Sequence, residues 1–172
     1  AVFLGGARVR PKICKAVALA NNSSDVGLAD AAASAIELLH CASLVHDDLP
    51  CFDDATQRRG KPSVHAKYGE RIAVLTGDAL IVAAFQTLAT HAIHAVRTER
   101  VPLVTAIVAR GVGAPHGICA GQAWECERSV DLSRYHRAKT GALFVAATCA
   151  GAAAAGVDAG PGVNLGARTA QA

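Results

Sequence analysis

Apolar residues recur at steps of three and four between residues 25 and 47, as at Ala29, Ala33, Ile36 and Leu39. This spacing places them on one face of an α-helix, whereas a half-buried strand would need strict alternation. Hydrophobic residues make up 52% of the chain and aromatic residues only 4%, with alanine very common. That composition favours closely packed helices over β-sandwiches. The sequence therefore predicts an all-α fold in which this segment is a core helix.

Caps and breakers predict the other helices. Ser24 or Asp25 can cap the core helix, and Asp131 or Ser133 can start a later one that is interrupted at Thr140-Gly141. We expect helices over about 11–21, 25–47, 70–90 and 102–112, another from about 116, and a last one from about 131 to 155. On the helix over 70–90 one face carries several apolar residues: Ile72, Leu75, Ala79, Val82 and Phe85. We expect residues 1–172 to form one domain, a helical bundle around a central cavity.

An acidic segment follows the core helix directly, with four carboxylates in eight positions: Asp47, Asp48, Asp53 and Asp54. These carboxylates stand at the negative end of a helix dipole, which disfavours them. A solvated loop is the alternative interpretation, but a bound cation explains this placement better. Mg²⁺ prefers oxygen ligands and is usually held by one or two carboxylates together with substrate phosphates. We therefore predict a Mg²⁺ site here.

Two arginines, Arg58 and Arg59, come just after the acidic segment. A guanidinium offers a planar fork of donors to phosphate oxygens. Carboxylates for a metal and arginines for an anion, side by side, indicate a site for a complex of Mg²⁺ with a diphosphate.

Charge and cysteine content narrow the class of protein further. A net charge of +3 is too small to indicate nucleic-acid binding, and the chain has no run of about 18 uncharged apolar residues that would predict a membrane span. The six cysteines include no Cys-x-x-Cys pair, and no secretory signal precedes them. They are interpreted as small buried residues in a reducing compartment, so we expect a cytoplasmic protein. Cys41 and Cys51 flank the acidic segment, where packing is favoured over reactivity.

Four motifs in order resemble the trans-prenyltransferases of the polyprenyl synthetase family. They are Gly-Gly-x-Arg-x-Arg-Pro at 5–11, Asp-Asp-x4-Asp with Arg-Arg-Gly-Lys-Pro at 47–62, Gly121-Gln122, and Lys-Thr-Gly-Ala-Leu-Phe at 139–144. The chain is most similar to bacterial geranylgeranyl and farnesyl diphosphate synthases. The resemblance implies a bundle of the isoprenoid synthase type. It also implies a homodimer that condenses isopentenyl diphosphate with dimethylallyl, geranyl or farnesyl diphosphate.

The resemblance also implies roles for individual residues. Asp47 and Asp53 would carry the metal, with Asp48 and Asp54 as supporting acids, and the predicted catalytic set is Asp47, Asp48, Asp53, Arg58 and Lys139. The allylic diphosphate would be contacted by Arg58, Gln122, Lys139 and Thr140. The isopentenyl diphosphate would be held by Arg10, His40 and Arg59, with Arg8 supplying a contact that the family usually makes with lysine at the position of Ala7.

Three of these roles have structural alternatives. Arg8 is equally well explained as a surface charge, and His40 as a core histidine, although His40 lies two helical turns before Asp47 and so on the same face. Lys139 lies on an otherwise apolar helix, where burial is costly without an anion, which favours a role in binding.

Product length is predicted from the residues before Asp47. Cys41, Ala42 and Ser43 are all small, whereas related farnesyl-producing enzymes carry an aromatic residue in place of Ala42. A small residue leaves a deeper channel, so we expect the C20 product geranylgeranyl diphosphate. Farnesyl diphosphate is the alternative product.

The family's second aspartate-rich motif is not found, and the chain stops about where that motif should begin. We therefore expect the chain to be an internal piece of a longer protein, and weakly active or inactive as it stands. A non-catalytic partner subunit is a second interpretation. A class I terpene cyclase is disfavoured, because Arg58-Arg59 and Lys139-Thr140-Gly141 suit a second diphosphate that cyclases lack.

Overall fold

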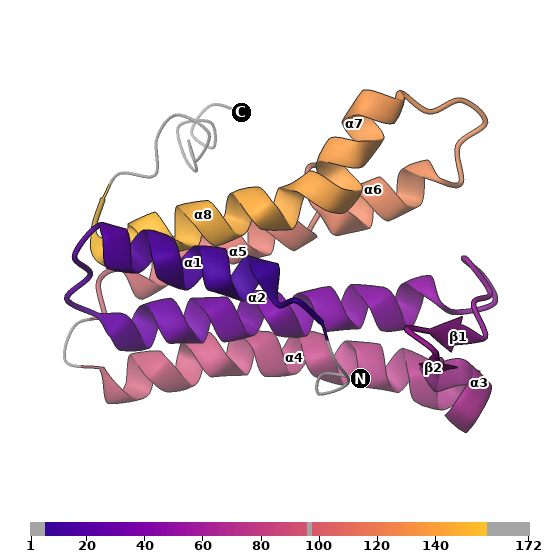
Figure 1. Cartoon of the computed structure of the whole chain (residues 1–172), viewed down its shortest axis with the longest axis horizontal. Coiled ribbons are helices and arrows are strands. Elements are labelled where there is room, and N and C mark those ends of the chain that lie inside the picture. The colour runs from indigo at the N-terminus through magenta and orange to yellow at the C-terminus, as the bar shows by residue number, and fades with distance from the viewer. Residues whose placement is uncertain (1–5, 96–97, 158–172) are drawn as a thin grey trace, which may run out of the picture.

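The computed structural model describes residues 6–95 and 98–157, which form a bundle of α-helices (Figure 1). Its long helices are α1 (Val9–Ala20), α2 (Val26–Asp47), α4 (Glu70–His94), α5 (Val101–Val112) and α8 (Ala142–Ala155). The short elements are β1 (Gln57–Arg58), β2 (Lys61–Pro62), α3 (Val64–Tyr68), α6 (Ile118–Trp124), α7 (Leu132–His136) and the π-helical turn η1 (Arg137–Gly141). Gly5 of the first motif lies outside the described residues. The all-α fold is as predicted.

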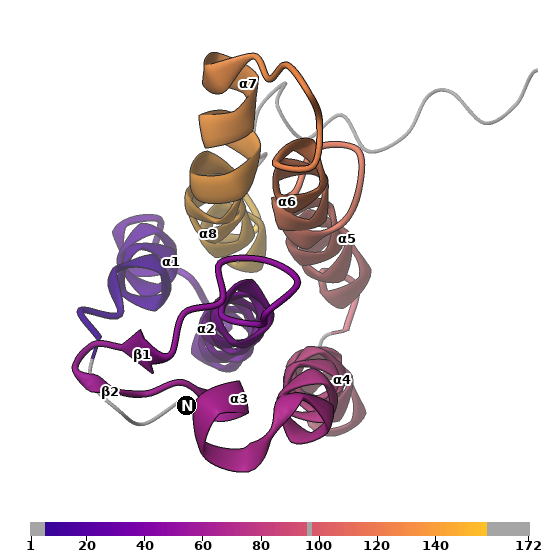
Figure 2. The same cartoon turned by 90° about the vertical axis from the view of Figure 1, so that its right-hand side faces the viewer.

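Helix α2 is the centre of the bundle. It packs against α4 on one side and against α1, α5 and α8 on the other (Figure 2). Its start matches the prediction, because the Asp25 side chain accepts a hydrogen bond from the Leu28 N–H at 2.8 Å. Ile36 and Leu39, from the predicted apolar face, are fully buried. The helix over 25–47 is therefore confirmed, and it ends where the acidic segment begins.

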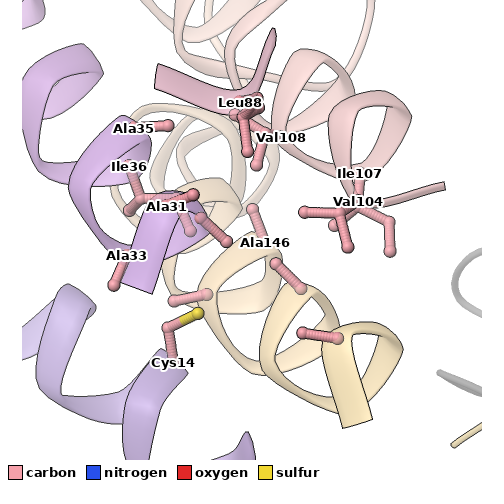
Figure 3. Close-up of a cluster of buried hydrophobic side chains, with 14 of the residues drawn as sticks. Cys14, Ala31, Ala33, Ala35, Ile36, Leu88, Val104, Ile107, Val108 and Ala146 are labelled. Carbon is pink, nitrogen blue, oxygen red and sulfur yellow. The ribbon is translucent and has the colours of Figure 1, made fainter. Parts of the chain in front are cut away.

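Small residues let the helices of the core approach closely. Figure 3 shows Cys14 of α1, Ile36 of α2, Val108 of α5 and Ala146 of α8 within one buried cluster. A Cβ on Gly151 of α8 would lie 2.3 Å from the Cys14 carbonyl oxygen, so only glycine fits there. Interiors packed this tightly do not accept an extra methyl group without strain. The many alanine residues thus allow the helices to pack closely.

Most of the apolar face predicted on α4 is exposed, whereas Phe85 of that face is half-buried and packs against the core. Ile72 is 49%, Leu75 63% and Val82 56% exposed, and Ala79 is exposed as well. Helix α4 instead turns small residues, among them Gly77, toward the bundle, where a Cβ would lie 2.0 Å from the His46 ring nitrogen Nε2. Because α4 is apolar almost all the way round, the spacing of its apolar residues does not identify the buried side.

Two further segments differ from the prediction. Residues 54–68, which lie between two predicted helices, contain the antiparallel pair β1–β2 and the short helix α3, which is capped by Ser63. The expected interruption at Thr140-Gly141 is not a break. Instead, η1 is a wide turn that joins α7 to α8, and Asp131 caps α7 as predicted.

The cysteines are only partly buried. All six lie within the described residues and are free. Cys14 and Cys41 are buried and Cys149 is half-buried, whereas Cys51, Cys119 and Cys126 are exposed. The prediction of six buried cysteines is therefore wrong for these three. Cys51 lies in the turn after α2, Cys119 on an outward side of α6, and Cys126 just after α6.

Three helical segments are long and apolar enough to cross a membrane when length and composition alone are considered: Val26–Asp47, Glu70–His94 and Leu132–Ala155. These segments contain charged residues, so none of them meets the condition of an uncharged apolar run that was applied to the sequence. Of the apolar windows in these segments, 61%, 22% and 44% respectively are buried inside the bundle. Val26–Asp47 is thus a core helix, while Glu70–His94 has the smallest buried share of the three.

Candidate active site

The acidic end of α2 is folded back on itself. The Asp53 N–H donates to the Asp47 carbonyl oxygen at 3.0 Å, and the Ala55 N–H donates to the Asp48 carbonyl oxygen at 3.2 Å. This turn places the side chains of Asp47 and Asp53 together. Partial burial raises the pKa of Asp53, and the negative charge of Asp47 raises it further. Two carboxylates held this close attract a cation.

Asp48 is buried and holds Arg58 of β1. Arg58 Nε lies 2.8 Å from Asp48 Oδ1 and 2.9 Å from Oδ2, and the Arg58 Nη2 atom lies 2.6 Å from Oδ1. The same Nη2 atom is 3.3 Å from Asp47 Oδ2. The hydrogen bonds to Asp48 raise the pKa of Arg58, outweighing the partial burial that lowers it. Arg58 is thus the charged partner of Asp48, whereas Asp47 lies in a cluster with the carboxylates of Asp53 and Glu125.

Lys139 reaches the same site from η1, and Gly121 of α6 makes that approach possible. A Cβ on Gly121 would lie 2.4 Å from the Lys139 backbone nitrogen. The Lys139 Nζ atom is 3.1 Å from Asp47 Oδ1 and also contacts Glu125 Oε1. Burial lowers the pKa of Lys139, but the carboxylates of Glu125 and Asp47 outweigh burial and raise it overall. A turn of π-helix, a feature frequent at functional sites, positions this lysine.

Glu125 was not predicted, yet it belongs to the acidic cluster. Carboxylate oxygens of Asp47, Asp53 and Glu125 all lie within 4.8 Å of one another. Asp47 Oδ1 is buried and forms no hydrogen bond within the described part of the chain. Hard cations such as Mg²⁺ select oxygen donors of this kind, so the donor set fits Mg²⁺. The one signal in the sequence was the position of Glu125, three residues after Gln122 and so on the same side of α6.

A second, cationic pocket of about 250 Å³ lies beside the acidic cluster. Its lining includes Arg8, His40, Arg58, Arg59 and Lys61, together with Cys41 and the buried Asp48. The pKa of His40 is lowered to about 4, first by burial and then by the positive charges of Arg10, Arg59 and Arg58. Neutral His40 and the cations around it form a cavity suited to an anion.

The remaining predicted residues lie in several environments. Arg10 is stacked 4.4 Å from the Phe144 ring centre, and burial lowers its pKa, although Glu37 opposes this shift. Gln122 donates to Glu125 at 2.5 Å, and Thr140 is exposed. Asp54 lies outside the acidic cluster, with its Oδ1 atom 3.7 Å from His65 Nε2. Of the residues expected to set product length, Cys41 lines the cationic pocket and Ala42 is buried.

A helical bundle whose central helix ends in paired carboxylates, with arginines and a lysine drawn in from other elements, is a fold of the isoprenoid synthase type. The chain belongs to the polyprenyl synthetase family, whose sequence model matches residues 1–166.

Two curated relatives and one solved structure illustrate this similarity. The geranylgeranyl diphosphate synthase of Cereibacter sphaeroides is 58% identical over 173 residues, which is 100% of this chain and 59% of that protein. The enzyme of the same name from Rhodobacter capsulatus is 55% identical over 97% of this chain and 57% of its own length. An FPP/GFPP synthase from Zymomonas mobilis superimposes with a TM-score of 0.81 at 35% identity, over 90% of this chain and 57% of that one. The chain thus spans less than two thirds of these relatives.

Proposed function

We propose that this chain acts in a Mg²⁺-dependent trans-prenyltransferase that joins isopentenyl diphosphate to an allylic diphosphate and makes geranylgeranyl diphosphate. One observation carries this proposal. The acidic cluster of Asp47, Asp53 and Glu125 lies directly beside the cationic pocket, and Arg58 lines that pocket and also contacts Asp47. Two diphosphates, one bound through a metal and one through cations alone, need two adjoining sites of this kind.

The reaction breaks the bond between the allylic carbon and its diphosphate oxygen. Asp47 and Asp53 would hold Mg²⁺, which supplies positive charge to the departing diphosphate. Arg58 and Lys139 would contact the same diphosphate and stabilise its growing negative charge. Such contacts accelerate the reaction because they are stronger in the transition state than in the bound substrate.

The second substrate would bind in the cationic pocket. Arg8, Arg10, His40 and Arg59 would hold the isopentenyl diphosphate so that its double bond attacks the allylic carbon. A carbon–carbon bond forms, and a proton then leaves the product. Apolar helices around the site would keep water from the reactive carbon.

The C20 product is supported by two observations. The relatives from Cereibacter sphaeroides and Rhodobacter capsulatus carry the name geranylgeranyl diphosphate synthase. Ala42 is small and buried one turn or so before Asp47. Farnesyl diphosphate is the alternative product, and its formation would require a shorter channel.

A second copy of the chain is proposed to cover α4. Ile72, Leu75, Ala79 and Val82 form an exposed apolar stripe on this helix. An exposed apolar stripe of this kind suits an interface, and the family resemblance favours a second copy of the chain as the partner that covers it. The six free cysteines and the low net charge support a cytoplasmic protein that does not bind nucleic acid.

The dimer is tested by measuring mass in solution by sedimentation. Leu75→Glu should shift the protein to monomer, because a carboxylate would be buried at the interface. Leu19→Glu on α1 is the matched control, since Leu19 is 64% and Leu75 63% exposed. A wild-type monomer, or an unchanged dimer in Leu75→Glu, would contradict the proposed interface.

The activity is tested by supplying the length that the relatives have and this chain lacks. Residues 1–157 are fused in place of the matching part of the Cereibacter sphaeroides enzyme. The fusion is then incubated with Mg²⁺, labelled isopentenyl diphosphate and each allylic starter in turn. We expect a C20 product from the fusion, its loss in Asp47→Asn, and a shorter product from Ala42→Phe.

The same assay separates the other interpretations. An inactive fusion that still binds Mg²⁺ would favour a non-catalytic partner subunit. A cyclised hydrocarbon formed without isopentenyl diphosphate would favour a terpene cyclase. An unchanged C20 product from Ala42→Phe would overturn the proposed basis of chain length.

A further inference from the structure

The Lys139 ammonium lies between two carboxylates from different parts of the bundle. It is 3.1 Å from Asp47 Oδ1 at the end of α2, and it contacts Glu125 Oε1 just after α6. Glu125 has two further donors, because Tyr135 OH donates to its Oε1 atom and Gln122 Nε2 donates to its Oε2 atom at 2.5 Å. Glu125 is therefore fixed by three donors, whereas the contact of Lys139 with Asp47 Oδ1 lacks hydrogen-bond geometry. The two carboxylates hold the ammonium unequally.

A metal ion and Lys139 compete for the same carboxylate. Both are positive, and both would approach Asp47, which the Lys139 ammonium contacts and which belongs to the carboxylate cluster that fits Mg²⁺. Like charges at contact distance in a partly buried site repel each other strongly. A cation that binds Asp47 therefore weakens the contact of the ammonium with this carboxylate. Glu125 is not one of the two carboxylates, Asp47 and Asp53, proposed above to hold Mg²⁺, so its contact with Lys139 can remain.

We propose that Glu125 is a positioning residue for Lys139, which keeps the ammonium inside the site when Asp47 binds a metal ion. This inference rests on the proposed function, because it concerns how the same site accommodates its metal and diphosphate. Without an anchor, a long lysine side chain gains rotamer freedom by moving into solvent. With Glu125 in place, the ammonium stays near the position where the diphosphate would arrive, and less order has to be created on binding.

The backbone supports the anchor. Gly121 places α6 against the Lys139 backbone, and this contact leaves no room for a side chain. Gln122 follows Gly121 directly and donates to Glu125. Tyr135 on α7 completes the arrangement, since its hydroxyl donates to Glu125 and its ring centre lies 5.7 Å from Lys139 Nζ. The segment 121–125 thus acts as one support for the lysine.

The test measures how fast Lys139 is acylated by an N-hydroxysuccinimide ester, with mass spectrometry of the digested chain. An ammonium engaged with carboxylates reacts slowly, and one that has moved into solvent reacts fast. In wild-type protein we expect Lys139 to react more slowly than exposed Lys12, both without metal and with saturating Mg²⁺. In Glu125→Gln we expect a modest increase without metal. With Mg²⁺ we expect an increase of about tenfold, the factor implied by loss of one charge-assisted hydrogen bond.

Matched variants separate positioning from general disruption. Glu127→Gln, which neutralises an exposed acid two residues further on, should leave the Lys139 rate at the wild-type value. Glu125→Asp keeps a carboxylate and should restore part of the protection, which local unfolding would not allow.

Two outcomes would overturn the inference. One is an equal Lys139 rate in wild type and Glu125→Gln with and without Mg²⁺. The other is a wild-type rate that rises with Mg²⁺ to the rate of Glu125→Gln. Failure of the proposed metal site would look different, because Mg²⁺ would then change the Lys139 rate in neither protein. The metal-free rates alone would in that case decide the inference, and they must still be higher in Glu125→Gln.

Discussion

Arg58 Nε lies 2.8 and 2.9 Å from the two carboxylate oxygens of Asp48, so a buried acid at the end of α2 holds an arginine of β1 in place. Asp48 is only 3% exposed. A buried carboxylate of this kind is stable only with a charged partner, and the partner in turn is held in one orientation. The guanidinium is thereby kept at the boundary between the acidic cluster and the cationic pocket.

Replacing Asp48 with Asn should therefore destabilise the protein more than a substitution that breaks an exposed ion pair. We expect the free energy of unfolding to fall by about 2 kcal/mol, because Arg58 would remain partly buried without its counter-charge. The measurement is urea unfolding. Asp30→Asn is the matched control, since Asp30 pairs with Lys15 at 2.9 Å while about half of each side chain is exposed. That change should cost less than about 1 kcal/mol, and equal costs would contradict the prediction.

Gly121→Ala should both lower the free energy of unfolding and disturb the acidic cluster. The new Cβ would lie 2.4 Å from the Lys139 backbone nitrogen, so α6 and η1 would have to separate. Overpacking of this kind costs about 2 kcal/mol, even after the gain in helix propensity. Urea unfolding and Mn²⁺ affinity measure the two effects.

Gly141→Ala provides the control for this change. Gly141 lies in the same π-helical turn as Lys139, but the nearest atom to its Cβ would be His136 O at an ordinary 3.7 Å. We expect stability there to stay constant or to rise by up to about 1 kcal/mol. A loss in Gly141→Ala equal to that in Gly121→Ala would show that the turn, and not the close approach, is sensitive.

His40 should make the stability of the protein depend on pH. Its pKa is lowered to about 4 in the folded state, first by burial and then by three arginines, from 6.5 in the unfolded chain. Between these values the unfolded chain binds more protons, so the contribution of neutral His40 is complete above pH 6.5 and is lost as the pH falls toward 4. Allowing for solvent screening, we expect a loss of about 1–2 kcal/mol from this residue.

The difference between wild type and His40→Gln isolates this contribution from that of the carboxylates. The free energy of unfolding is measured for both proteins from pH 7.5 to about 4.5, and we expect wild type to lose more of it than His40→Gln. His94→Gln, at an exposed position near the end of α4, should follow wild type across the range. Parallel curves for wild type and His40→Gln would contradict the lowered pKa.

Local signals in the sequence were sufficient for α2 and for the acidic segment after it. Asp25 is an N-cap, the apolar spacing that follows is helical, and Asp47 and Arg58 lie only eleven positions apart. The buried side of α4 was not predictable in this way, because the helix is apolar almost all round and the choice is made by Gly77 fitting against His46. Tertiary packing thus selects one face where the pattern allows several.

The acidic cluster shows the same limit. Lys139 was predicted through a family motif, but Glu125 belongs to no quoted motif and reaches Asp47 across 78 positions of chain. Its place depends on Gly121 packing against the Lys139 backbone, a contact between α6 and η1 that no local pattern encodes. Residues that join a site through such approaches become visible only in three dimensions.

Asp47→Asn should abolish most of the metal binding proposed for the acidic cluster. Asp47 shares carboxylate oxygens within 4.8 Å with Asp53 and Glu125, and its buried Oδ1 atom forms no hydrogen bond in the described ranges 6–95 and 98–157. Loss of its charge removes one of the two carboxylates proposed to hold the metal ion, so we expect Mn²⁺ affinity, measured by electron paramagnetic resonance, to fall at least about tenfold. Asp54→Asn changes an acid that lies outside the cluster, near His65, and should weaken Mn²⁺ binding less than about threefold. If the two variants lost affinity equally, general negative charge, and not this cluster, would account for the binding.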